Sequence, residues 1–499
     1  MSLLNHYHYI FYDLETTGQN PCFDQVVRFA AKETDSNLKI INDYNISIQL
    51  RNDIIPHPKA LLVNKLNIDD LKEGIVEYEA FTQIHKIMNQ SNTINIGYNS
   101  LGFDDKFLRF GFYRNLLDPY THQYNQKFRA DLYKMIFLYY LYKQDESIIW
   151  PTPNNRLSLK LEEINAINYL YDGMSHDAEV DVYVTIELAK KLKSIDNKMW
   201  DYLVSSFIAD NDLQYFNKLN TLTCIDDSNY KIGVFISNKN GLKSNYASPV
   251  IELCTAHENG LIRKKKKKLL RLDNYVFEDF NENNFAEKIE KGILSKTFGE
   301  PNFILPFSDK YLRIFNEHVI GLAKSNLSWI KHHPNAIKTL IDKHQNMDYC
   351  NENIIDLDAS LYQSNDDGGG WFTKEEQLYR EKFHHASLAN KVDYVLRLDD
   401  SKAQSRIKKI AIRILGRNYF DSLSSALQED YSHYLNMIFH KEPTTADFAD
   451  NMRSNPKLLL KETRELSKKS GLSNKDQNIL EQLENMISTK IQTQQDLGF

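Results

Sequence analysis

The chain has 499 residues, and its 61 lysines and arginines against 67 aspartates and glutamates give a formal net charge of −6 at pH 7. This balance excludes a histone-like protein that binds nucleic acid through bulk positive charge, although it leaves room for a local basic surface. Four cysteines lie far apart, no segment is typical of a signal peptide, and no apolar run of about 18 residues could span a bilayer. We therefore expect a cytoplasmic protein.

Strand and helix patterns alternate over the first 200 residues. Four short apolar or β-branched runs predict strands, at residues 9–14, 25–33, 44–50 and 93–97. Four longer segments have helical periodicity, at residues 104–114, 130–143, 157–170 and 178–193. This order predicts an α/β domain with a mixed sheet, which we place at residues 1–195.

The rest of the chain differs from this first part. The net charge changes from −5 over residues 1–200 to +2 over 201–350 and −3 over 351–499. Short strand-like segments predict a β-rich second domain with inserts over residues 196–352. A glycine-rich break at residues 366–370 lies within a third, mostly helical domain over residues 353–499, which ends in a short polar tail.

Asp13 and Glu15 lie at the end of the first predicted strand. Residues two apart on a strand share a face, so both carboxylates point together while Leu14 points into the opposite core. Two such carboxylates repel unless a cation lies between them, and hard oxygen ligands suit Mg²⁺ or Mn²⁺. An Asp-x-Glu pair is common, however, and the chain has another at Asp177 and Glu179, so the pair alone does not define a metal site.

Asp104 opens the helix that follows the strand at residues 93–97. A carboxylate at a helix start can be a simple cap or a ligand. Asp105 and Asp131 are rivals for a ligand role. Asp105 is adjacent on the helix and must point elsewhere, and Asp131 begins an apolar helix as a cap would, so we favour Asp104.

His176 lies in the loop before the last helix of this region, and Asp181 lies in the first turns of that helix. Val182, Ile186 and Ala189 form an apolar stripe that Asp181 borders. A histidine in a loop is usually a solvated surface residue, whereas a carboxylate beside an apolar stripe needs a partner. Asp181 is therefore the stronger candidate when each residue is taken alone.

Together these segments resemble the DEDDh exonuclease superfamily. Its pattern is Asp-x-Glu on the first strand, an Asp after a central strand, and His-x4-Asp at a late helix. Here those positions are Asp13, Glu15, Asp104, His176 and Asp181. The likeness extends over nearly the whole chain to the exonuclease I family of bacteria. It is carried by short segments at residues 97–99, 103–105, 112–115, 118–120, 150–151, 176–178, 181–183, 358–362 and 416–419.

The resemblance implies a ribonuclease H-like exonuclease domain, an SH3-like domain and a helical C-terminal domain. It also implies a 3′→5′ exonuclease that degrades single-stranded DNA to mononucleotides in DNA repair and recombination. Two Mg²⁺ ions about 4 Å apart, replaceable by Mn²⁺, would be held by Asp13, Glu15, Asp104 and Asp181. His176, with a reference pKa near 6.5, would be the general base, or would orient the scissile phosphate.

Single-stranded DNA needs basic groups for its phosphates and aromatic rings for its bases. By resemblance, Arg109, Tyr120 and Tyr124 fall where the family contacts DNA, and Glu15 would face it too. Lys160 stands where the family has an arginine near the terminal phosphate, and a lysine lacks the bidentate fork of arginine. Ordinary surface charge or core packing is the alternative for all of these residues except Glu15.

Two further basic patterns stand out. Five cations spaced by four, three, four and four residues share one helix face and form a predicted phosphate-binding track, at Lys402, Arg406, Lys409, Arg413 and Arg417. The run at residues 263–268 contains one arginine and five lysines. The resemblance lends it no support, and we favour a solvated loop or strand edge over a DNA clamp.

The resemblance also links the family to the acidic C-terminal tail of single-stranded-DNA-binding protein. Lys143 or the middle basic cluster could serve that tail, and we expect a monomer. Two alternatives stay open: a ribonuclease of the same superfamily, and a non-catalytic nucleic-acid-binding scaffold. Superfamily ribonucleases are typically single-domain, which argues against the first. An inert scaffold would be expected to lose one of the five motif residues, and all five are present.

Overall fold

The computed structural model describes residues 6–120, 126–144, 147–173, 177–224, 228–240, 246–258, 261–347, 356–362, 370–399, 401–440, 446–449 and 451–496. The chain forms two compact units. The larger unit comprises Tyr7–Lys127, Tyr171–Ile186 and Asn351–Phe499, and the smaller unit comprises Met1–His6, Phe128–Leu170 and Glu187–Cys350. The boundaries of the three domains inferred from the sequence stay a prediction. No helix in the described ranges is both long and apolar enough to cross a membrane.

The first sheet is mixed, as predicted, and has the strand order β3-β2-β1-β4-β5. Its strands are β1 (His8–Thr16), β2 (Val26–Thr34), β3 (Ile40–Ser47), β4 (Thr93–Gly97) and β5 (Lys127–Asp131). β1 pairs antiparallel with β2 and parallel with β4, so it is a central strand. A central strand is covered on both faces, which explains why β1 is buried almost throughout.

Four helices of this half of the chain lie in the larger unit or enter it: α1 (Pro58–Asn64), α2 (Glu77–Met88), α3 (Asp104–Arg114) and α6 (Ala178–Ile195). α3 is buried on two sides. Phe107 and Phe112 join Ile10 and Phe81 in a core against the sheet, whereas Phe110 joins a second core with the C-terminal helices. The N-terminus of α3 is thereby held at the end of β4.

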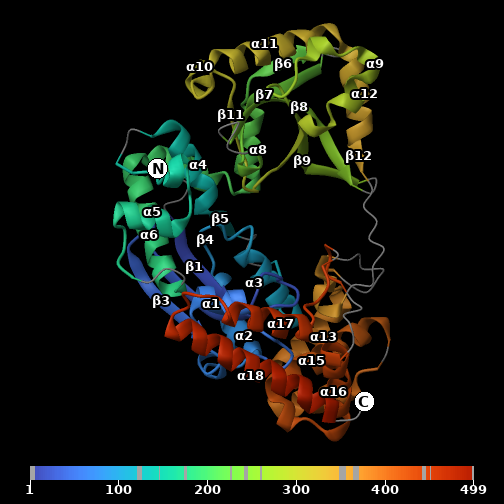
Figure 1. The fold of residues 1–499 in the computed structure, drawn as a ribbon. Coiled ribbons are helices and arrows are strands. Elements are labelled where there is room, and N and C mark those ends of the chain that lie inside the picture. Colours follow the sequence, from blue (N-terminus) through green and yellow to red (C-terminus); the bar gives the residue numbers. More distant parts are fainter. Residues whose placement is uncertain are drawn as a thin grey trace. The chain divides into compact units, whose positions relative to one another are not determined.

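The C-terminal part of the larger unit is helical, as expected. Its helices are α13 (Lys374–His385), α14 (Leu388–Arg397), α15 (Lys402–Tyr419), α16 (Ser425–His440), α17 (Pro456–Ser467) and α18 (Asn474–Asp496). α17 and α18 pack against α1, where Leu61, Leu459 and Leu483 share one core (Figure 1). α18 continues into the polar, glutamine-rich tail as far as Asp496.

The smaller unit contains α4 (Leu132–Tyr142), α5 (Leu161–Asn168), α7 (Asn197–Ser205), α8 (Ala209–Asn217) and a second sheet. That sheet has the order β10-β9-β8-β7-β11, with β6 beside β7 and β12 beside β8. Its strands are β6 (Thr221–Cys224), β7 (Ser228–Ile236), β8 (Ala247–Glu258), β9 (Leu261–Arg271), β10 (Ile293–Thr297), β11 (Phe303–Pro306) and β12 (Asn346–Met347). The other helices of this part are α9 (Glu282–Lys288), α10 (Asp309–Leu312), α11 (Glu317–His332) and α12 (Pro334–Gln345), of which α9, α11 and α12 pack on the sheet (Figure 1).

The run of basic residues at 263–268 lies on a strand rather than in a loop, and the part of it that pairs with strands on both sides, Lys267 and Lys268, is not at a strand edge. It lies on β9, which pairs with β8 on one side and with β10 on the other. Lys267 forms an ion pair with Glu252 of β8 at 2.7 Å and donates a hydrogen bond to Thr255. An acid on the neighbouring strand therefore compensates a lysine that the sequence alone left unpaired.

Candidate active site

β1 presents two carboxylates to one face of the first sheet. Leu14 packs in the core on the opposite face, while Asp13 and Glu15 share a face with Arg28 of β2. Arg28 is the direct cross-strand partner of Glu15. Glu15 is buried and Asp13 is partly buried. The alternation predicted from the sequence is therefore the one that the strand adopts.

Asp104 and Asp181 come from the first turns of two helices. Asp104 is the first residue of α3 and is buried, and Phe103 occupies the cap position without a side-chain cap hydrogen bond. Asp131, the rival, accepts a hydrogen bond from the Tyr133 backbone N–H at 3.0 Å and is the N-cap of α4. Asp105, the other rival, forms an ion pair with Arg109 at 2.8 Å. Both rivals therefore have structural partners.

Mutual repulsion among the four carboxylates raises the pKa of two of them, which indicates that the four lie close together. Burial, followed by repulsion from Asp104, Asp181 and Glu15, raises the pKa of Asp13 well above its usual value. Burial, followed by Asp181 and Asp104, raises the pKa of Glu15 to about 9, against a lowering contribution from Arg28. Each group destabilises the charged form of the others, and a divalent cation would remove that repulsion.

The donor set fits a hard divalent ion, because it consists of carboxylate oxygens. Among the residues that the structure describes, no three His, Cys, Asp or Glu side chains already converge as ligands on one point. His176 lies outside the described residues, as does Tyr124, so the predictions for these two residues have no structural counterpart here.

The start of α6 is fastened to the sheet by contacts that sequence reasoning missed. Arg28 forms an ion pair with Asp177 at 3.3 Å, and Lys32 forms one with Glu179 at 3.3 Å. Asn45 of β3 also donates a hydrogen bond to Glu179. These contacts hold the residues next to His176 and Asp181. The sequence could have indicated these contacts, because Arg28 and Lys32 lie on one face of the otherwise apolar strand β2 and each needs an acidic partner.

Arg109 and Tyr120 lie together in the larger unit. The Arg109 guanidinium is 5.1 Å from the centre of the Tyr120 ring, and its Nη1 donates to the Tyr362 hydroxyl at 3.4 Å. Lys160 belongs to the smaller unit and is exposed, with Glu162 and Glu163 at 3.6 and 3.8 Å. Lys160 therefore reaches solvent, but nearby acids reduce its local positive field.

The phosphate-binding track predicted on α15 is wrong for three of its five residues. Arg406 is 7% exposed and pairs with Glu376, Arg413 pairs with Asp356 and Asp358, and Arg417 is 7% exposed and pairs with Asp53 and Asp358. Buried arginines whose charge is already compensated are not available to phosphates. Lys409 is exposed, and the side chain of Lys402 lies outside the described part of the structure.

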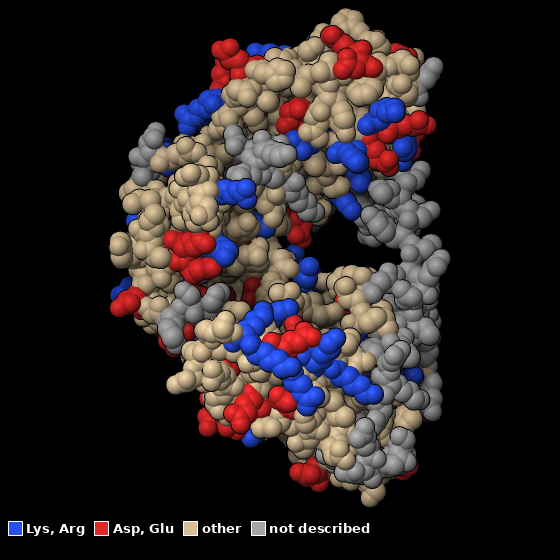
Figure 2. Space-filling model, viewed as in Figure 1, with Lys and Arg blue, Asp and Glu red and all other residues tan. Residues whose placement is uncertain are grey.

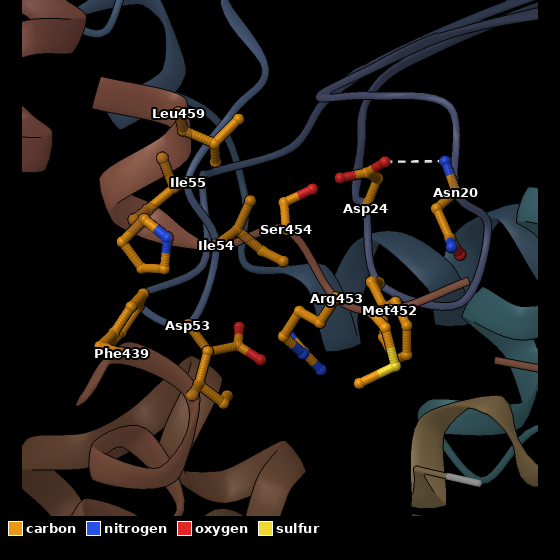
Figure 3. Close-up of a pocket in the computed structure, with 13 residues that line it drawn as sticks. Asn20, Asp24, Asp53, Ile54, Ile55, Phe439, Met452, Arg453, Ser454 and Leu459 are labelled. Atoms are coloured by element: carbon orange, nitrogen blue, oxygen red, sulfur yellow. Dashed lines mark hydrogen bonds between the residues drawn. The ribbon is translucent and has the colours of Figure 1, made fainter. Parts of the chain in front are cut away.

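The surface shown in Figure 2 carries lysines and arginines interleaved with aspartates and glutamates. A pocket in the larger unit, shown in Figure 3, is lined by residues that include Asn20, Asp24, Asp53 and Arg453. None of the four predicted metal ligands lines that pocket. The carboxylate cluster and this pocket are therefore lined by different residues.

Comparison with known proteins defines the class of this site. The family model described as Exonuclease matches residues 10–189, a range that contains all four carboxylates and His176. Exodeoxyribonuclease I of Buchnera aphidicola subsp. Schizaphis graminum is 26% identical over 86% of this chain and 87% of its own length. Exodeoxyribonuclease I of Escherichia coli is 25% identical over 87% of this chain and 90% of its own length.

The fold agrees with these sequence matches. The crystal structure of E. coli exonuclease I in complex with a dA16 oligonucleotide has a TM-score of 0.81 to this chain. It is 20% identical, and the match covers 97% of this chain and all of that one. Residues 10–189 therefore form an exonuclease domain. The chain is similar over most of its length to bacterial proteins named Exodeoxyribonuclease I, and the resemblance predicted from the sequence is confirmed.

Proposed function

We propose that this chain is an exodeoxyribonuclease that hydrolyses single-stranded DNA from the 3′ end to mononucleotides. The observation that carries the proposal is the cluster of Asp13, Glu15, Asp104 and Asp181, two of them buried and two partly buried, in which burial and mutual repulsion raise the pKa of Asp13 and Glu15. Relatives named Exodeoxyribonuclease I align with most of the chain. From the resemblance, we also propose a role in DNA repair and recombination.

The cluster is proposed to bind Mg²⁺, with Mn²⁺ as a substitute. When bound, two such ions would stabilise the attacking and leaving oxygens of an in-line phosphodiester displacement. Solved structures of E. coli exonuclease I with single-stranded DNA include a zinc-bound form and a metal-free form. The proposed ligands of this chain are all carboxylate oxygens, which favour Mg²⁺ over the softer zinc ion.

The proton chemistry is assigned to His176. It takes a proton from the attacking water as general base, a role that its reference pKa suits at neutral pH. Arg28 and Lys32 support this step indirectly, because they bind Asp177, which directly precedes α6, and Glu179, which lies in its first turn. Arg109, Tyr120, Tyr124 and Lys160 are proposed to contact the strand, and Glu15 lies where the terminal nucleotide would meet the ligands.

The wider assignments follow the same resemblance. We propose that the second sheet belongs to an SH3-like domain and that the α13–α18 helices form a separate C-terminal domain. We also propose a cytoplasmic monomer that binds the acidic C-terminal tail of single-stranded-DNA-binding protein. Cys22 and Cys254 are free thiols, which agrees with a reducing compartment.

One assay tests the function directly. The purified chain is incubated with 5′-labelled single- and double-stranded DNA and RNA, with Mg²⁺ and with chelator. We expect a ladder that shortens from the 3′ end for single-stranded DNA with metal only. Equal digestion of RNA would favour a ribonuclease, and binding without cleavage would favour a scaffold. A His176→Ala variant should bind the strand and cleave it at least about a hundredfold more slowly.

A further inference from the structure

An exposed tryptophan lies on the surface next to the predicted DNA-binding residues. Trp371 is 52% exposed, whereas Trp200 is fully buried and Trp329 is 6% exposed. The rings of Trp371 and Tyr120 are stacked, with centroids 4.4 Å apart and planes 24° apart. Large aromatic rings usually bury their surface, so an exposed and ordered one indicates a contact surface.

The aromatic pair is held in place from beneath. Arg109 contacts the Tyr120 ring and is fixed by its ion pair with Asp105. Arg406 donates a hydrogen bond from Nη2 to the Trp371 backbone oxygen at 3.2 Å and is itself held by Glu376. The arginine that the sequence suggested as a phosphate ligand therefore anchors the tryptophan backbone. A preorganised ring loses little conformational entropy when a ligand stacks on it.

This surface is a short distance from the carboxylate cluster. Asp105 follows Asp104 directly on α3, and Arg109 lies five residues after Asp104. At 1.5 Å per residue, that is a rise of about 7–8 Å along the helix axis. A strand whose 3′ end enters the cluster would therefore reach Tyr120 and Trp371 within a few nucleotides.

We propose that Trp371, supported by Tyr120, is a stacking platform for a base of the single-stranded DNA substrate. The inference rests on the proposed function and deepens it, because it assigns a base-binding subsite. The neighbouring cation is already paired with Asp105, so the surface offers an aromatic face with little net charge. Such a surface suits a nucleobase better than a phosphate, and it tolerates any base.

Equilibrium binding tests the platform. A fluorescein-labelled oligothymidylate is titrated with wild-type protein and with Trp371→Ala and Trp371→Phe variants, in chelator so that no cleavage occurs. We expect Trp371→Ala to lower affinity about tenfold and Trp371→Phe to stay within about threefold of wild type. Leu378→Ala, which removes a 59% exposed apolar side chain from α13, is the matched control and should have no effect. Equal affinity of Trp371→Ala and wild type would overturn the proposal.

Abasic substitution locates the stacked base. A single abasic nucleotide is placed at successive positions from the 3′ end of the oligonucleotide. In the wild type, one position should weaken binding, and in Trp371→Ala that same position should no longer matter. Equal losses in both proteins at every position would contradict stacking on Trp371. Because binding is measured without cleavage, a wild type that binds in this pattern but never cuts DNA would refute the exonuclease function and leave the platform standing.

Discussion

Arg417 of α15 and Asp53, which follows β3, are joined by a hydrogen bond from Nε to Oδ2 of 2.9 Å, and both side chains are buried. Arg417 also donates to Asp358 and to the Tyr434 hydroxyl, and Tyr434 donates in turn to Asp53. Burial alone would raise the pKa of Asp53, but Arg417 and then Arg51 lower it well below its usual value. The two ends of the larger unit are therefore linked through charge.

This link is part of a larger buried charge cluster. Its members come from segments that are far apart in the chain, and they are Arg51, Arg114, Arg413, Arg417 and Arg453 with Asp53, Glu77, Asp356 and Asp358. Asp53 and Arg453 also line the pocket in Figure 3. Such a cluster is costly to desolvate, so it persists only while its charges stay paired.

Replacing Arg417 by Met should destabilise the larger unit by about 3–5 kcal/mol, because Asp53 and Asp358 would be left buried without their main partner. Chemical denaturation followed by circular dichroism measures the change. Arg464→Met is the matched control, since Arg464 is 54% exposed and pairs with Glu484 on the surface, where a pair contributes about 0–1 kcal/mol. Equal effects of the two substitutions would contradict the cluster's structural role.

His384 of α13 predicts a pH dependence of stability. Its Nε2 donates to the Leu116 backbone oxygen at 2.9 Å, so its Nδ1 accepts the Tyr78 hydroxyl at 2.8 Å. Burial lowers the pKa of His384 to about 4 from its ordinary 6.5. The unfolded chain takes up this proton first, so stability is complete above about pH 6.5 and is lost as pH falls towards 4.

The expected loss from His384 is on the order of 3 kcal/mol across this window. Unfolding free energies are compared at pH 7.5 and pH 5 for wild type, His384→Gln and His385→Gln. His384→Gln should show a smaller difference between the two pH values than wild type. His385→Gln changes the exposed neighbour on the same helix and should keep the wild-type difference. If all three proteins lose the same free energy, His384 is not the responsible group.

Replacing Asp13 by Asn should separate activity from stability. The substitution removes one of four mutually repelling carboxylates, so in chelator the melting temperature should rise by about 2–4 °C. Cleavage in Mg²⁺ should fall by on the order of 10³-fold, because a charged ligand is lost. Asp131→Asn is the control: it can keep the cap on Tyr133 and should change cleavage by less than about twofold. A less stable but active Asp13→Asn variant would refute the ligand assignment.

The elements that the sequence predicted well are those set by local pattern. Thr93–Gly97 and Asp104–Arg114 agree residue for residue with the predicted strand and helix, because a short apolar run and a clear helical period define them. The mixed sheet followed from the order of these elements. α2 was missed, and β9 was misread because its lysines conceal the alternation that marks a strand.

The charges on α15 could not be assigned from local pattern. Helical spacing correctly places Arg406, Arg413 and Arg417 near one another, but it does not reveal what covers that face. The acids that neutralise them, Asp53 and Glu376 among others, lie up to 364 residues away in the chain. Pairing over such separations depends on the tertiary fold. The metal, general-base and DNA-contact assignments elsewhere stay predictions that the variants described above can test.

Gly111 of α3 gives a last prediction, in which packing opposes helix propensity. In a helix interior, Ala is favoured over Gly by about 1 kcal/mol. A Cβ at Gly111, however, would lie 2.0 Å from the Phe81 ring, in the core beneath the carboxylate cluster. Overpacking of this kind costs about 1–3 kcal/mol or more, so Gly111→Ala should be destabilising overall and should also slow cleavage by displacing the helix that carries Asp104.

Gly321 of α11 is the matched control for Gly111, because it is also inside a helix but has nothing within 4 Å of the position of a Cβ. Gly321→Ala should therefore stabilise the protein by about 0.5–1 kcal/mol and leave cleavage unchanged. Thermal and chemical denaturation of both variants measure the two effects. The same sign for both substitutions would show that close packing of α3 on α2 does not determine the position of Asp104.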